Sequence, residues 1–157
     1  GRVIMELTER ETVLDLDRLR DNLAALQRAG VRIAADDVGA GNAGLRLLSQ
    51  FRFDIVKVDL SLVQEGANND ASRAVLRSLR DLAARWGAFV IAEGIETPTQ
   101  LRAVRELGLA AGQGYLIGRP GSIVDLPPVD LAGLEQGQLM LQNAPTPSAV
   151  VATGSPA

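Results

Sequence analysis

Side chains that could do chemistry follow short apolar runs at several places along the 157-residue chain. The densest of these places is the pair Asp36 and Asp37, which follows the mainly apolar run at residues 31–35 and precedes a loop with two glycines, Gly39 and Gly41. Adjacent carboxylates repel each other unless a cation or a shared proton relieves the repulsion. The glycines allow the backbone to bend sharply or to approach a ligand closely. The segment therefore indicates a cation site, or otherwise a solvated loop with two surface acids.

The residue types that are missing narrow this chemistry. The chain contains no cysteine and no histidine, which excludes disulfides and thiolate chemistry and removes the commonest general base and transition-metal ligand. A metal would have to be held by oxygen, which favours Mg²⁺, Mn²⁺ or Ca²⁺. The net charge of −3 and the 3% of aromatic residues argue against a DNA-binding surface.

The same composition bears on location. No run of about 18 apolar residues is present, so we expect no membrane segment in this chain. The absence of cysteine and of a signal peptide is compatible with a cytoplasmic location. The first residue is Gly1 rather than Met, which indicates a piece of a longer parent that could itself be membrane-anchored.

Apolar runs alternate with amphipathic helical patterns, and this order predicts five strands joined by helices. Right-handed connections between such strands give a parallel sheet with helices outside. A closed (β/α)8 barrel needs about 250 residues. We therefore predict an α/β protein, a partial TIM-like (β/α)8 barrel with its N-terminal units missing, over residues 1–135. Residues 136–157, rich in Ala, Pro, Thr and Ser, are expected to be a disordered tail.

Local signals predict several helix features. Thr12 is expected to cap the first helix, and Thr97 with Gln100 forms a capping box around Pro98 at the start of the last one. Another helix should bury a stripe at helical spacing, which comprises Val75, Leu79, Leu82 and Trp86.

In a barrel the carboxyl ends of the strands form one rim. Six polar residues lie in or at the ends of the five predicted strands, and they are Glu6, Asp36, Asp37, Lys57, Glu93 and Gln113. Asp59 is a further candidate, because it shares a strand face with Lys57. Such a set supports phosphoryl transfer assisted by two cations about 3.5–4 Å apart. Without histidine, Lys57 and Glu93 remain to orient or deprotonate the attacking water.

Five segments carry a resemblance to a known family. They resemble, in order, the motifs of the EAL domain over residues 2–120, and they read Glu6-Leu7-Thr8-Glu9, Asp36-Asp37-Val38-Gly39-Ala40-Gly41, Lys57-Val58-Asp59, Glu93-Gly94-Ile95-Glu96 and Gln113-Gly114-Tyr115. The resemblance implies a TIM-like barrel that hydrolyses the bacterial messenger cyclic di-GMP to linear pGpG with Mg²⁺ or Mn²⁺.

The resemblance also implies roles for single residues. Glu6, Asp36 and Asp37 match metal ligands. Lys57 matches the residue that holds the attacking water, and Glu93 matches a catalytic glutamate near the metals.

Three more matches concern the substrate and a loop. Glu96 and Gln113 match positions that line the substrate and water site. Glu9 matches the glutamate that steadies the loop after Asp37, a loop tied in this family to dimerisation. A homodimer through this loop and fusion to upstream sensory or GGDEF-type domains are therefore expected.

The sequence departs from the family pattern in two ways. The Glu-Ala-Leu signature and the asparagine-bearing strand after it are absent, so the isolated chain is expected to have an incomplete site and negligible activity. The loop at residues 38–42 lacks the usual threonine and aromatic residues. This departure puts loop order and dimer coupling in doubt, but it removes no metal ligand.

Two alternatives to the phosphodiesterase remain open. One is a catalytically inactive EAL module that acts as a cyclic di-GMP receptor or a protein-interaction domain. The other is an unrelated Mg²⁺-dependent barrel enzyme, such as one that stabilises an enolate.

Overall fold

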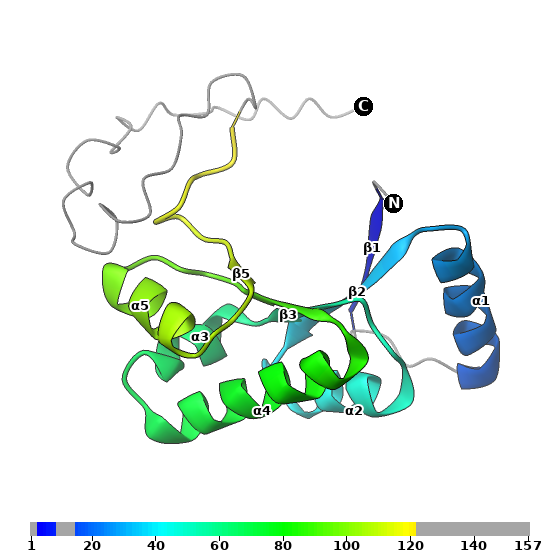
Figure 1. Ribbon diagram of the computed structural model, residues 1–157, viewed down its shortest axis with the longest axis horizontal. Helices are drawn as coiled ribbons and strands as arrows, with labels where there is room; N and C mark the ends of the chain where they lie inside the picture. Colours follow the sequence, from blue (N-terminus) through cyan, green and yellow to red (C-terminus); the bar gives the residue numbers. More distant parts are fainter. Residues whose placement is uncertain (1–2, 9–14, 122–157) are drawn as a thin grey trace, which may run out of the picture.

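The computed structural model describes residues 3–8 and 15–121, and it contains five parallel strands with helices between them (Figure 1). The strands are β1 (Ile4–Leu7), β2 (Arg32–Val38), β3 (Ile55–Val58), β4 (Phe89–Ala92) and β5 (Ala111–Gly112). The helices are α1 (Leu16–Arg28), α2 (Asn42–Gln50), α3 (Leu60–Gly66), α4 (Asp70–Trp86) and α5 (Pro98–Glu106).

The strands lie side by side in the order of the sequence, from β1 to β5, and every neighbouring pair is parallel. Helices α1 and α2 pack against β2, and α4 packs against β4. The predicted order of strands and covering helices is therefore confirmed. All five strands end at the same edge of the sheet, because parallel strands share one direction.

The core lies between the strands and these helices. Strands that are covered on both faces are typically apolar throughout, and residues 33–35 of β2 and 55–56 of β3 form such stretches. Ile33, Val38, Val56 and Val58 are each at most 1% exposed. The best-buried strands of the sheet thus include β2 and β3, whose ends carry Asp36, Asp37 and Lys57.

The buried face of α4 differs from the prediction. Val75 is 43% exposed, while its neighbour Leu76 is 1% exposed and packs in the core with Leu79 and Ala83. Leu82 and Trp86 pack only partly buried against the core. The predicted stripe and the observed one both repeat at helical spacing, so the period alone could not separate them.

Two helix starts test the capping predictions. Thr97 forms the predicted capping box with Gln100, with Pro98 in the first turn of α5. The N-cap of α1 is Asp15, whose Oδ1 accepts a hydrogen bond from the backbone N–H of Arg18 at 2.9 Å. Asp15 is therefore the N-cap of α1, and the predicted cap Thr12 lies outside the described residues.

Some predictions lie outside the described residues. Glu9 and the predicted tail at 136–157 belong to this part of the chain. Among the described helices, none combines the length and apolarity that crossing a membrane requires.

Candidate metal centre at the carboxyl ends of the strands

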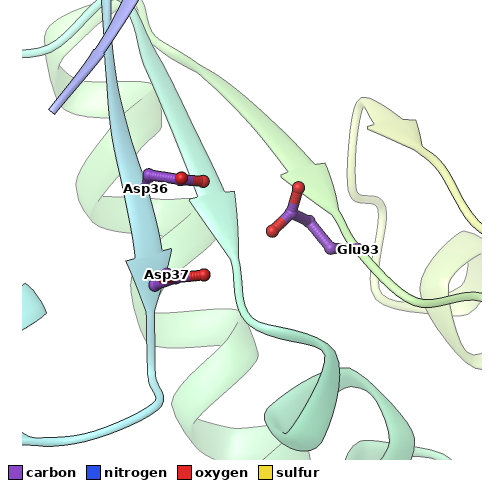
Figure 2. Close-up of side chains that lie close together, drawn as sticks. All are labelled: Asp36, Asp37 and Glu93. Carbon is purple, nitrogen blue, oxygen red and sulfur yellow. The ribbon is translucent and has the colours of Figure 1, made fainter. Parts of the chain in front are cut away.

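A β-bulge at the end of β2 places Asp36 and Asp37 together. Ala35 pairs with Val56 and Val38 pairs with Val58, so the two aspartates of β2 lie opposite the single residue Lys57 of β3. Asp37 has a φ of +55°, in the left-handed region that aspartate tolerates better than most residues. In a regular strand, adjacent side chains would point to opposite faces. Instead, both carboxylates extend toward the side on which Glu93 lies (Figure 2).

Glu93 follows β4 directly, and the next turn fixes its position. Gly94 has a φ of +67°, and a Cβ placed on it would lie 2.3 Å from Cβ of Leu60. The carbonyl of Gly94 accepts a hydrogen bond from Nε2 of Gln64 at 3.4 Å. Only glycine therefore fits between Glu93 and the first turn of α3.

Gln113 is brought to Glu93 by a second close approach of backbone. A Cβ on Gly114 would lie 2.2 Å from the backbone of Ile95, so these two segments touch. Backbone hydrogen bonds of 3.0 Å join Ile95 to Gln113 and Leu116 to Ile95. In this position the amide of Gln113 donates a hydrogen bond of 2.7 Å to Oε1 of Glu93.

Oxygens of three acids converge at this edge of the sheet. One carboxylate oxygen from each of Asp36, Asp37 and Glu93 lies within 4.8 Å of the others, and all three side chains are half-buried (Figure 2). This donor set contains only hard oxygen ligands, which suits Mg²⁺, Mn²⁺ or Ca²⁺. The residues therefore fit the divalent cation expected from the sequence.

Lys57 lies at the centre of the acidic residues. Its Nζ is 2.7 Å from Oδ1 of Asp36, 3.0 Å from Oε1 of Glu93 and 3.0 Å from Oε2 of Glu6. The Lys57 side chain is 12% exposed, and those of Asp36 and Glu93 are each 15% exposed. The three ion pairs link the ends of β1, β2, β3 and β4 through one ammonium group.

These contacts change the proton affinities of two groups. Burial acts to lower the pKa of Lys57, but hydrogen bonds to Asp36, Glu6 and Glu93 outweigh it and hold that pKa above its ordinary value. Burial raises the pKa of Glu93, assisted by the charges of Asp36 and Asp37 and opposed by Lys57. The site thus combines a firmly charged lysine with a glutamate whose charged form is disfavoured.

The other predicted site residues lie at different distances from this cluster. Glu6 contacts Lys57 but is not one of the three converging acids, and its side chain is 47% exposed. Glu96 is exposed, and its backbone N–H donates to Oε1 of Gln100 at 2.8 Å. Asp59 caps α3, since its carboxylate accepts from the backbone N–H of Ser61 at 2.9 Å and from the Ser61 hydroxyl.

Sequence reasoning missed helix α3 and its contacts with the site. Leu60 packs against Gly94, next to Glu93, and Leu62 lies under Gly39, where an added Cβ would be 2.8 Å from Leu62 Cδ2. The first turn of α3 therefore supports the loops that follow both Asp37 and Glu93. The available signal was Asp59 two residues before Ser61, a typical N-cap arrangement.

Fold and site together define a parallel α/β protein whose strand ends carry an acidic cluster suited to divalent cations. The family model of the EAL domain matches residues 1–120, and the chain belongs to this family. EAL domains have a TIM-like barrel fold, and the five strands and their helices form part of such a barrel.

Similar proteins support this assignment. The chain is 37% identical over 123 residues to the probable cyclic di-GMP phosphodiesterase PdeA of Escherichia coli, covering 78% of this chain and 17% of that protein. It matches the cyclic di-GMP-bound form of an EAL protein from Vibrio cholerae at 29% identity and a TM-score of 0.72, covering 81% of this chain and 53% of the other. It also matches the manganese and cyclic di-GMP complex of Klebsiella pneumoniae BlrP1 at 37% identity and a TM-score of 0.69. This match covers 76% of this chain and 30% of the BlrP1 chain.

The matched proteins are longer than this chain. The chain spans 15% and 17% of two of the curated relatives and about half of the solved Vibrio cholerae chain.

Proposed function

We propose that this chain carries the acidic part of a cyclic di-GMP phosphodiesterase site, which uses two divalent cations, Mg²⁺ or Mn²⁺, to hydrolyse the cyclic dinucleotide to linear pGpG. Membership of the EAL family, a relative named as a probable cyclic di-GMP phosphodiesterase, and a similar structure holding manganese with cyclic di-GMP support this function. The observation that carries it is the convergence of Asp36, Asp37 and Glu93 beside Lys57.

The acids at the ends of β1 and β2 would hold the cations. Asp36 and Asp37 already place oxygens close together, and Glu6 is joined to them through Lys57. Bound cations would supply positive charge that stabilises the phosphodiester during attack and would lower the pKa of water. They also offset the repulsion between an acidic rim and a phosphodiester anion.

The remaining polar residues act on water and substrate. Glu93 is suited to accept a proton from the attacking water, because burial raises its pKa and makes its carboxylate a stronger base, and because it lies beside the cation ligands. Lys57 orients water and balances negative charge in the transition state. Gln113 positions Glu93 through their hydrogen bond and, together with Glu96, lines the substrate side.

The expected partners follow from the same family. We propose a cytoplasmic protein that forms homodimers through the loop after Asp37, in a parent with further signalling domains. The greater length of the curated relatives supports the last point.

A chimera tests the proposed hydrolysis. Residues 1–120 would replace the matched segment of Klebsiella pneumoniae BlrP1, and conversion of cyclic di-GMP to pGpG would be followed with Mn²⁺ or Mg²⁺. We expect metal-dependent turnover that falls at least about 100-fold in the Asp36→Asn chimera. The 157-residue chain alone, run in parallel, is expected to show no turnover above background.

The same experiment can instead favour the alternative of a catalytically inactive cyclic di-GMP receptor. A folded chimera that binds cyclic di-GMP with Mn²⁺ and leaves it intact would contradict the phosphodiesterase. The altered loop at residues 38–42 would then be the first segment to restore to the usual family pattern.

A further inference from the structure

Lys57 occupies a position that resembles that of a bound cation. Its ammonium group lies 2.7 to 3.0 Å from oxygens of three carboxylates, which come from the ends of three different strands. Two of these acids, Asp36 and Glu93, belong to the set whose oxygens converge for a metal. The same carboxylates are therefore shared between an internal cation and the cation proposed above.

Such sharing sets up a competition. An ammonium ion hydrogen-bonded to Asp36 and Glu93 occupies lone pairs that a metal would use, and its charge repels a divalent ion at short range. Lys57 is also confined, because it extends from the central strand β3 and its side chain is 12% exposed. The proposed metal ligands Glu6 and Asp36 both contact this ammonium group, so a divalent ion can bind them without competition only if the ammonium group moves away.

We propose that Lys57 is a built-in counter-cation that holds Glu6, Asp36 and Glu93 together and that a divalent ion must displace to bind with full affinity. This inference rests on the proposed metal site. It makes Lys57 a positioning residue that sets the metal affinity of the cluster and adds to any part it takes in hydrolysis.

The contact with Lys57 also explains the position of Glu6. Glu6 lies at the end of the edge strand β1, its side chain is 47% exposed, and the ammonium of Lys57 draws its carboxylate toward the cluster. Once a metal replaces the ammonium among these oxygens, Glu6 is left facing the metal. One displacement thus converts a lysine site with three carboxylates into a metal site with a fourth acidic ligand.

A spectroscopic test is available because Lys57 is the only lysine in the sequence. Selective ¹⁵N-lysine labelling of the 157-residue chain gives a single side-chain ammonium resonance. Titration with Mg²⁺ is expected to shift or broaden this resonance. The midpoint of this change should agree with the dissociation constant measured by calorimetry. A resonance that stays unchanged while calorimetry reports binding would overturn the proposal.

Matched variants give a second test by calorimetry with Mn²⁺ and by thermal melting after chelator treatment. Lys57→Met should bind Mn²⁺ at least about tenfold more tightly than the wild type. It should also melt lower without metal and recover with Mn²⁺. Lys57→Arg keeps the charge and should stay close to the wild type. Arg32→Met removes an equal charge at the opposite end of β2 and should leave Mn²⁺ binding unchanged.

The outcomes separate the two proposals. If the wild type binds Mn²⁺ and Lys57→Met binds it no more tightly, the proposed role of Lys57 as a counter-cation is wrong. The proposed metal site is then still supported. If neither chain binds Mn²⁺, the metal site itself is wrong and the inference fails with it.

Discussion

At the scale of single residues, the backbone conformation of Asp37 helps to place the two aspartates of the cluster. Its φ of +55° lies in a region that costs most non-glycine residues roughly 1–2 kcal/mol. This conformation belongs to the bulge that sets Asp36 and Asp37 opposite Lys57. Bulges are commonly found next to active sites, where they redirect a side chain. The backbone of β2 is therefore locally strained where it brings two like charges to the same side.

Two substitutions of Asp37 distinguish the effect of its side-chain charge from the effect of its backbone conformation. In Asp37→Asn, the asparagine tolerates the left-handed conformation and removes one of two adjacent negative charges. Asp37→Ala tolerates it less well, and we expect it to be about 1 kcal/mol less stable than Asp37→Asn. Urea denaturation measures this difference. Equal stability of the two variants would show that the strain is not important.

At the scale of elements, helix α3 supports both loops of the site. Its side chains Leu60 and Leu62 pack against Gly94 and Gly39, and Gln64 donates to the carbonyl of Gly94. The helix is short and begins at Asp59, whose carboxylate caps its first turn. Asp59 therefore supports the site through the helix that it caps.

Removal of this cap should lower stability without removing a ligand. We expect Asp59→Ala to lose about 1 kcal/mol of folding free energy and to retain Mn²⁺ binding. Asn69→Ala is the matched control, because Asn69 caps α4 by accepting from the N–H groups of Ala71 and Ser72. Loss of Mn²⁺ binding in Asp59→Ala but not in Asn69→Ala would identify Asp59 as a ligand.

The helices also show where sequence patterns stop being informative. The capping box at Thr97 was predictable, because both partners lie three residues apart and interact locally. The buried face of α4 was not, since Leu76 rather than Val75 meets the core and both fit a helical repeat. Packing against other elements decides between such patterns, and a single sequence does not contain that information.

At the scale of the whole molecule, the parallel order of the strands follows from alternation of apolar runs and helices, and it was predictable. That order places Asp36, Lys57 and Glu93 at one edge, as expected for parallel strands. The bulge at Asp36 and Asp37 and the three contacts of Lys57 were not predictable. They depend on the register between β2 and β3, which only the folded sheet fixes.

The whole fold brings these acids to one edge of the sheet, where we expect them to bind a divalent cation. Electron paramagnetic resonance of free Mn²⁺ in the presence of the 157-residue chain measures this binding most directly. The wild type should bind Mn²⁺ saturably, Asp36→Asn should weaken binding at least about tenfold, and Asp17→Asn, which removes an equal charge from helix α1, should bind as the wild type does. Equal binding by Asp36→Asn and the wild type, or no saturable binding by either, would contradict the account.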